Sequence, residues 1–273
     1  MLQPRYRFLS LSAFAFAALT LPAAAVTDCN LAKGLSLDPA TFNQQVTTCY
    51  DSQSDAAQNA RLEDELIKAT DRVRAGEREG SLTPLTSLEQ AARIHAMDMA
   101  VRNYAGHIDL EGRGHLDRVR MLDRTVLIGA AGANIAIVEG TGLAPDDVFE
   151  ALRRDPVNAT NMTRSAFTHT GVGIAEANGR TYVVQLFARV DGQLDAPLPI
   201  YTSGKQNIRA TFAEKGLQPV AWRLTSPEGD TLKRGYGTTM SAALPPGQRA
   251  YLTLDFVRDD KEFAIRGPII TGQ

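Results

Sequence analysis

The chain has 273 residues, of which 44% are hydrophobic and 22% are charged. This composition is typical of a folded protein with a sizeable apolar core. Its 29 basic and 31 acidic residues give a net charge of −2, and neither sign is clustered. We therefore expect no nucleic-acid partner, because such a partner requires grouped lysines and arginines.

The first 25 residues have the anatomy of a secretory signal peptide. Two early arginines precede an apolar run over residues 8–21, and alanines at 23–25 form a small-residue cleavage site. The apolar run is short for a membrane span, although an uncleaved anchor is the alternative. We expect a mature chain that starts near Val26, has no stable membrane span, and is secreted or periplasmic.

Cys29 and Cys49 are the two cysteines of the chain. An even pair in an exported protein usually forms a disulfide, and the alternative is two unrelated buried thiols. Closing a loop of about twenty residues stabilises a fold by roughly 3 kcal/mol. We predict that this bond cross-links an N-terminal segment, residues 26–58.

Helical patterning follows this segment. Apolar residues recur at helical spacing between positions 62 and 76. A second helix is predicted to begin around Thr86, which is spaced with Glu89 as a capping box. A third is predicted over residues 146–153, because Pro145 suits the first turn of a helix.

Strand patterning begins after residue 165. Residues 169–177 and 180–190 are strand-like runs joined by Asn178-Gly179, a strong hairpin signal. Helices segregated from an antiparallel hairpin indicate an α+β domain, which we place at residues 59–190.

The C-terminal part of the chain has a different pattern. Residues 191–200 contain a glycine and two prolines and are predicted to be a linker. Turn signals then separate short strand-like runs, so residues 201–273 are predicted to form a small all-β, sandwich-like accessory domain. The predicted strands are 208–212, 220–224, 232–236, 250–256 and 262–270.

The stretch NYAGHIDLEGRGHLDR at positions 103–118 concentrates the candidate chemistry. It contains His107, Asp109, Glu111 and His115 in an irregular region, where functional groups tend to gather. Their spacing matches no established metal-ligand pattern. The chain also lacks a GxSxG nucleophile turn and a phosphate-binding glycine loop.

Three histidines have simpler interpretations. His95 falls on the apolar face of its predicted helix and is expected to be a core residue. His115 is expected at a solvated helix start. His169 precedes a strand and is expected to be structural. His107, between two glycines in the irregular stretch, is the strongest candidate for function.

Five segments, taken in order, resemble a bacterial CAP domain, the superfamily of cysteine-rich secretory proteins, antigen 5 and plant pathogenesis-related proteins. They are AARIHAMDMA (91–100), NYAGHIDLEGR (103–113), GANIA (132–136), DPVNATNM (155–162) and FTHTGVGIAEANGRTYVVQLF (167–187). The resemblance covers about residues 60–190. It implies an α-β-α sandwich around an antiparallel sheet, with an open cleft.

Many members of the superfamily line this cleft with two histidines and acidic residues, and some bind a divalent metal there. His107 matches the first cleft histidine. The glutamate of the family's GENIA is Ala133 here, and the histidine of SPxHRxN is Asn158. Asn134 and Asn161 match retained, structural asparagines. An alanine methyl cannot bind metal, and a carboxamide is a poor ligand beside imidazole, so the metal site is predicted to be degenerate.

The functional hypothesis follows from this degenerate cleft. We assign no catalytic residue, no metal and no cofactor, and expect a non-enzymatic module that binds a lipid, a peptide or a cell-envelope component. The alternative is a hydrolase in which His107 acts with a relocated carboxylate. The cleft candidates are His107, Asp109, Glu111, His115, Asn134 and Asn158.

Overall fold

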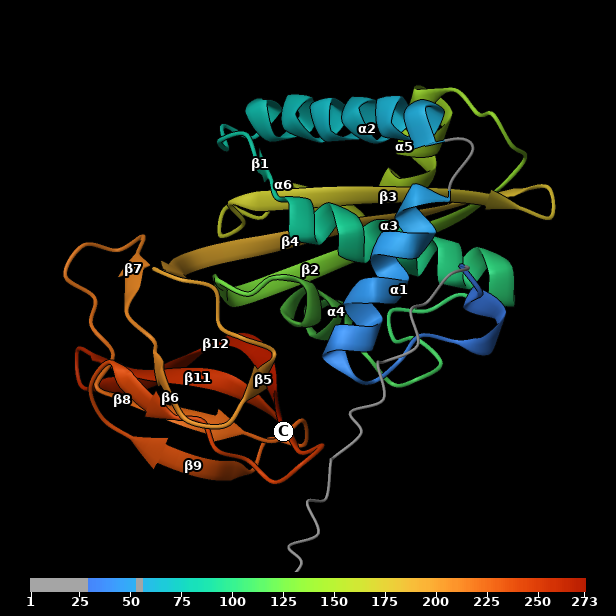
Figure 1. Cartoon of the computed structure of the whole chain (residues 1–273). Coiled ribbons are helices and arrows are strands. Elements are labelled where there is room, and N and C mark those ends of the chain that lie inside the picture. The colour runs from blue at the N-terminus through green and yellow to red at the C-terminus, as the bar shows by residue number, and fades with distance from the viewer. Residues whose placement is uncertain (1–28, 53–55) are drawn as a thin grey trace, which may run out of the picture.

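The computed structural model describes residues 29–52 and 56–273, so the predicted signal peptide lies outside the described residues. The described elements up to residue 194 are helices interspersed with four strands (Figure 1). They are η1 (Leu31–Lys33), α1 (Pro39–Asp51), α2 (Ala56–Gly76), β1 (Thr83–Pro84), α3 (Thr86–Arg102), α4 (His115–Leu122), β2 (Val126–Glu139), α5 (Pro145–Arg153), α6 (Pro156–Thr163), β3 (His169–Ala177) and β4 (Arg180–Leu194).

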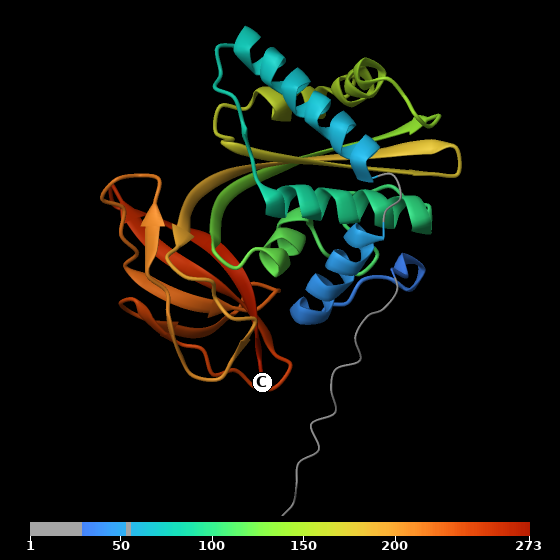
Figure 2. The same ribbon diagram turned by 45° about the horizontal axis from the view of Figure 1, so that its top comes forward.

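These elements form the expected α-β-α sandwich. One core cluster joins α1, α3 and α4 to one face of the sheet, and a second joins α2, α5 and α6 to the other face. Figure 2 shows the sheet nearly edge-on between these two helical layers. Strands β3, β4 and β2 pair in antiparallel fashion, and the short β1 is added parallel to β3.

The hairpin of β3 and β4 forms where its sequence predicted it. Asn178 and Gly179 have φ values of 53° and 75°, the positive range that a two-residue type I′ turn requires. On β3, a Cβ at Gly171 would lie 2.3 Å from the backbone nitrogen of Glu89, and one at Gly173 would lie 2.0 Å from that of Arg93. These glycines therefore allow α3 to pack directly on the sheet.

Helix starts follow local chemistry, with one correction. Asp38 caps α1 by accepting from the backbone of Thr41 at 2.9 Å, and Pro39 occupies the first turn. The capping box predicted at Thr86 is wrong. Leu85 is the N-cap of α3 and makes no side-chain capping bond, so packing of this almost fully buried helix substitutes for a cap.

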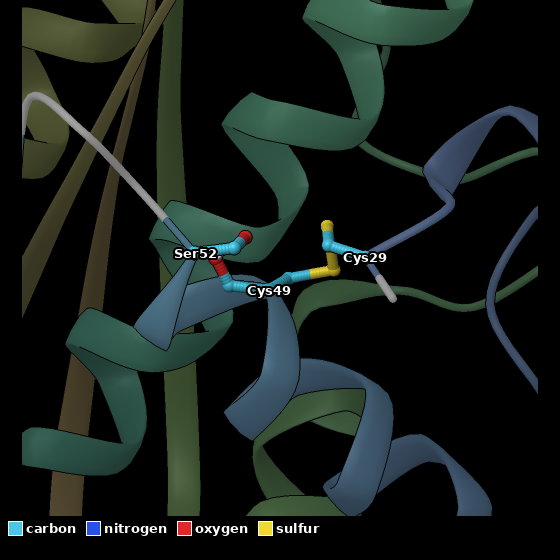
Figure 3. The surroundings of a disulfide bond; sticks show 3 residues. All are labelled: Cys29, Cys49 and Ser52. Carbon is cyan, nitrogen blue, oxygen red and sulfur yellow. Dashed lines mark hydrogen bonds between the residues drawn. A yellow bond between two sulfur atoms is a disulfide. The ribbon is translucent and has the colours of Figure 1, made fainter. Parts of the chain in front are cut away.

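The disulfide predicted between Cys29 and Cys49 is present. Cys49 lies in the last turn of α1 and is buried in the first core cluster. Figure 3 shows that the bond joins the segment before η1 to this helix end, next to Ser52. The bond thus fixes the N-terminal segment against the layer formed by α1, α3 and α4.

The C-terminal region is strand-rich, as expected, and it extends the main sheet. The strands follow the order β1-β3-β4-β2-β12-β11-β8-β9, and β2 meets β12 where Ile128 pairs with Arg266. The elements are β5 (Tyr201–Thr202), β6 (Lys205–Asn207), β7 (Ala210–Phe212), β8 (Ala221–Thr225), β9 (Thr231–Gly235), β10 (Thr239–Ser241), β11 (Arg249–Arg258) and β12 (Lys261–Gly272). A third core cluster, which includes Trp222, Met240 and Leu252, fills this part.

The boundary between the two parts is less sharp than the sequence indicated. Residues 191–194 of the expected linker belong to β4, and residues 192–194 pair with β7. Tyr251 and Ile269 of the C-terminal strands belong to the core cluster of the α-β-α sandwich. Conversely, Leu127 of β2 belongs to the C-terminal cluster. Each part therefore contributes side chains to the core of the other.

Candidate functional site

The candidate residues from positions 107 to 111 lie on one loop, residues 103–114, which we call the His107 loop. Asn103 ends α3 in the left-handed conformation with a φ of 52°, and Gly112 turns the loop with a φ of 85°. His95, buried in α3, contacts the carbonyl of Gly106 through Nε2 at 2.7 Å. Because a carbonyl only accepts, Nε2 carries the proton and ties the loop to α3.

Asp109 is buried and neutralised by two arginines. Its Oδ2 lies 2.8 Å from Nε of Arg113 and 3.3 Å from Nη1 of Arg118, and its Oδ1 accepts the backbone N–H of Arg113. Burial alone would raise the pKa of Asp109, but the attraction and hydrogen bonds of Arg113, followed by the charge of Arg118, hold it below its usual value. This carboxylate stabilises the loop and is not free to bind a ligand.

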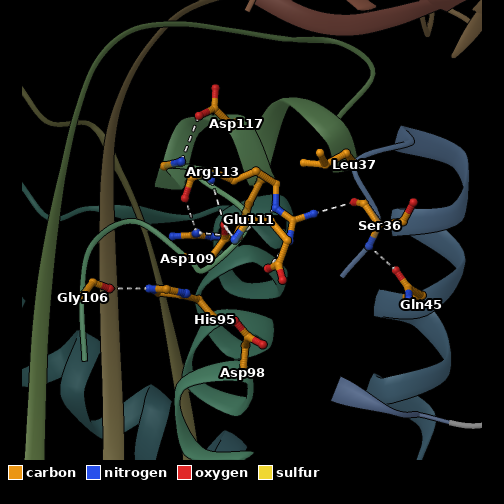
Figure 4. Close-up of polar contacts among 12 residues, drawn as sticks. Ser36, Leu37, Gln45, His95, Asp98, Gly106, Asp109, Glu111, Arg113 and Asp117 are labelled. Atoms are coloured by element: carbon orange, nitrogen blue, oxygen red, sulfur yellow. Dashed lines mark hydrogen bonds and ion pairs between the residues drawn. The ribbon is translucent and has the colours of Figure 1, made fainter. Parts of the chain in front are cut away.

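Glu111 is also committed to ion pairs. Its Oε1 lies 2.8 Å from Nη1 of Arg102, and its Oε2 lies 3.1 Å from Nη2 of Arg113. Arg102 continues the chain of alternating charges to Asp98 at 3.2 Å. Figure 4 shows Asp98, Glu111, Arg113 and Asp109 close together beside α3. The network locks the loop onto α3 and the start of α4.

His107 and His115 are the two candidates that do meet. Their ring centroids are 5.4 Å apart in an edge-to-face arrangement. His107 is exposed, whereas His115 is partly buried at the first turn of α4, and its Nδ1 is buried without a hydrogen-bond partner. Burial, with the charges of Arg118 and His107, lowers the pKa of His115 to about 4. His115 begins α4 as expected, but its ring is partly buried instead of solvated.

Asn134 and Asn158 have a structural role at the outer edge of β2. The Nδ2 of Asn158 donates to the carbonyls of Ile135 and Leu152, at 3.3 and 3.1 Å, and the Nδ2 of Asn134 donates to the carbonyl of Asn158 at 3.0 Å. Asn161 donates to the carbonyl of Ala133 at 3.3 Å. Helix α6 thus satisfies carbonyls that β4 leaves unpaired, which protects the edge of the strand.

Comparison with known proteins identifies the sandwich. The family model of the Cysteine-rich secretory protein family, CAP, matches residues 67–187. Residues 67–187 form a CAP domain. No curated protein matches the chain. The match leaves the C-terminal strands β5 to β12 outside the CAP domain.

Two solved structures are similar to parts of the chain. An outer surface protein from Borrelia burgdorferi is 16% identical with a TM-score of 0.42, and the match covers 48% of this chain and 93% of that one. An extracellular protein containing a SCP domain from Bacillus anthracis str. Ames is 21% identical with a TM-score of 0.43. That match covers 50% of this chain and 44% of the other.

The residues of this CAP domain do not fit the metal that some members of its superfamily bind. Asp109 and Glu111 are held by arginines, Ala133 is buried in the first core cluster, and Asn158 donates its amide hydrogens to carbonyls. Across residues 29–52 and 56–273, no three histidine, cysteine or acidic side chains are grouped to hold a metal ion. We therefore assign these residues no role as metal ligands.

Two features of the CAP domain were not predicted from the sequence. The first is the arginine network, in which Arg102 lies on α3, outside the stretch considered. The second is a pair of exposed apolar side chains on the His107 loop, since Ile108 and Leu110 are 55% and 57% exposed. Residues 107–112 form bends and turns, so no regular alternation in the sequence separates the exposed Ile108 and Leu110 from the buried Asp109.

Proposed function

We propose that the protein is an exported, non-enzymatic binding module that takes up the apolar part of a lipid, peptide or envelope component at the His107 loop. The observation that supports this most is the exposure of Ile108 and Leu110 on a loop held by buried ion pairs. A loop that is already ordered loses little conformational entropy when it binds a ligand. The exposed His107 adds a polar group beside the apolar pair.

The alternative function is hydrolysis with His107 as a general base. The T-shaped pair of His107 and His115 is the feature that favours it. A general base of this kind is usually oriented by a carboxylate, and both neighbouring candidates, Asp109 and Glu111, form ion pairs with arginines instead. This arrangement supports binding over turnover.

The test compares two apolar pairs that are similarly exposed. The mature protein, the double variant Ile108→Ser/Leu110→Ser and the control Val220→Ser/Val257→Ser are titrated with a fluorescent fatty acid and with a panel of apolar peptides. Val220 and Val257 are 49% and 48% exposed in the C-terminal region. We expect the loop variant alone to lose affinity, by about tenfold or more, because two buried aliphatic side chains contribute over roughly 1.4 kcal/mol.

A second measurement addresses the enzymatic alternative. Ester and peptide substrates are incubated with the wild type and with His107→Ala. Turnover that is abolished by this substitution would contradict the binding proposal, as would equal affinity of the loop variant and the control for every probe.

Export is part of the same proposal. The disulfide between Cys29 and Cys49 fits an oxidising compartment. Among the described residues, no helix is both long and apolar enough to cross a bilayer. Intact-mass measurement of the exported protein should give a chain starting near Val26, and a mass that retains residues 1–25 would instead indicate an uncleaved anchor.

A further inference from the structure

A cationic cluster occupies the junction of the CAP domain and the C-terminal strands, away from the His107 loop. It consists of Arg120 on α4, Arg266 on β12 and Tyr251 on β11. The guanidinium carbons of Arg120 and Arg266 lie 5.7 and 4.9 Å from the centroid of the Tyr251 ring. Figure 2 shows α4 beside the strands that carry the other two residues.

Arg120 differs from the other buried arginines of the described chain in having no acceptor. It is 7% exposed, its Nε is buried without a partner, and none of its side-chain N–H groups bonds to a described residue. Every comparable arginine has carboxylate or carbonyl acceptors. These arginines are Arg74, which donates to four carbonyls, Arg93, which pairs with Glu63, and Arg113 and Arg118, which pair with Asp109.

Among the described residues, nearby carboxylates form no ion pair with the two arginines, although the charge of Asp117 attracts Arg120. Asp117 accepts from the hydroxyl of Tyr251 at 2.6 Å and from the backbone of Gly114 at 2.9 Å. Asp123 accepts from the side chain and backbone of Thr125 and from the backbone of Val126. Arg266, which is partly buried, likewise has no carboxylate or carbonyl partner among the described side-chain contacts.

The two arginines also repel each other. After burial, the charge of Arg266 is the largest cause that lowers the pKa of Arg120, to about 10. Placing two guanidinium groups together in a partly desolvated site is unfavourable without an anion, because each group loses hydration and gains no hydrogen-bond acceptor. Stacking on Tyr251 uses the faces of the guanidinium groups and leaves the N–H groups at their edges unpaired.

We propose that a small oxyanion, a phosphate or sulfate group, binds at Arg120 and Arg266. The planar guanidinium group donates two parallel N–H bonds to such a group. The low exposure of Arg120 limits the ligand to a small anion or the terminal group of a small phosphomonoester, and it disfavours a lipid headgroup held in a bilayer. Because the site joins α4 to β11 and β12, a bound anion stabilises the junction of the two parts.

The experiment uses the mature protein with its disulfide intact. Inorganic phosphate, sulfate and glycerol phosphate are titrated calorimetrically at constant ionic strength set with sodium chloride, and thermal unfolding is followed in parallel. The variants are Arg266→Gln, Arg120→Lys and the matched control Arg153→Gln. Arg153 is exposed and paired with Glu150, so this control removes the same charge elsewhere.

We expect saturable binding at one site and a higher unfolding temperature with phosphate than with chloride. Arg266→Gln should weaken binding about tenfold or more, since it removes charge-assisted hydrogen bonds, while Arg153→Gln should not. Arg120→Lys keeps the charge but loses the bidentate geometry, so binding should weaken even where this variant folds normally.

Three results would overturn the proposal. The first is the absence of saturable phosphate or sulfate binding by the folded wild type at matched ionic strength. The second is an equal loss of affinity in Arg266→Gln and Arg153→Gln, which would indicate a general charge effect. The third is binding to phosphatidic acid vesicles without binding of soluble glycerol phosphate, which would indicate a membrane surface instead of a small-anion site.

Discussion

His95 and His115 are histidines that the fold keeps neutral. Burial is the main cause that lowers the pKa of His95 to about 3 and of His115 to about 4, from an ordinary value of 6.5. In both rings Nδ1 is buried without a partner. Protonation would place an N–H group with no acceptor inside the protein, so the neutral form is required for packing.

These histidines predict a loss of stability in acid. Between pH 6.5 and about 4, the unfolded chain binds protons that the folded rings exclude, so the free energy of unfolding falls as the pH falls. Each such proton contributes about 1.4 kcal/mol per pH unit. Urea unfolding of His115→Gln between about pH 6 and pH 4.5 should show a slope reduced by about one proton. The control Val220→Ser, at an exposed position without a titratable group, should retain the wild-type slope, and an unchanged slope in His115→Gln would contradict the burial argument.

The ion pairs of Asp109 and Glu111 predict weak metal binding. A zinc site needs three or four imidazole, thiolate or carboxylate ligands. The His107 loop and the start of α4 offer only His107 and His115, because Asp109 and Glu111 form ion pairs. Calorimetric titration of the mature protein with Zn²⁺ should therefore show no tight binding that depends on His107. Tight binding by the wild type that disappears in His107→Ala would show that the ion pairs rearrange around the metal.

Helix α3 packs directly on strand β3 in the CAP domain. The GVG sequence at 171–173 removes two side chains that would otherwise meet the backbone of α3. The contact lies between backbones, which cannot move apart cheaply, so these positions are restricted to glycine by space and not by conformation.

This contact predicts a large cost for one methyl group. Gly173→Ala places a Cβ 2.0 Å from the backbone nitrogen of Arg93 and should destabilise the protein by about 3 kcal/mol or more, at the upper end of overpacking effects. Gly204→Ala is the control, since it is exposed and has open space around it, and should change stability by less than about 0.5 kcal/mol. Chemical denaturation of both variants measures the difference, and equal stability would show that α3 shifts away freely.

The disulfide predicts a second effect at the level of elements. It joins residues 20 positions apart and attaches the start of the described chain to α1. Loop closure of this length contributes about 3 kcal/mol, so reduction of the wild type should lower its urea midpoint. Cys29→Ala/Cys49→Ala should begin at the lower midpoint and be insensitive to reductant. A wild type whose midpoint does not respond to reductant would show that the bond adds no stability.

At the scale of the whole molecule, the CAP domain and the C-terminal strands share a sheet and side chains of their cores. Ile128 pairs with Arg266, while Tyr251 packs in the core of the sandwich and Leu127 in the core of the C-terminal region. The division at residues 191–200 stays a prediction of the sequence. Cores that share side chains in this way favour joint unfolding, because unfolding of one part exposes apolar surface of the other part to water.

We therefore expect one unfolding transition. Trp222 is the single tryptophan of the chain and is buried in the C-terminal core. Helical circular dichroism reports mainly on the part before residue 165, which contains α1 to α6. The two signals should change together during thermal unfolding. Fluorescence that changes at a clearly different temperature from circular dichroism would establish independent domains. A fragment of residues 26–200 should be less stable than the mature chain, and equal stability would support the same conclusion.

Local sequence was enough to predict several parts of this protein. The hairpin at Asn178-Gly179, α2 and α5, and the cysteine pair follow from short-range signals such as turn geometry and helical periodicity. The α-β-α fold came from the resemblance of five ordered motifs, and the replacement of cleft partners of His107 by Ala133 and Asn158 stays a prediction of that resemblance.

Tertiary structure decided the rest, because burial and ion pairing join residues far apart in the chain. The middle of strand β2, GAAGAN at 129–134, has little strand propensity of its own and is held by the long ladder with β4. Asp109 pairs with Arg113 of its own loop, but Arg118 joins it only after α4 packs against that loop. The cluster at Arg120 likewise arises from long-range packing, since its other two residues lie on strands at the far end of the chain.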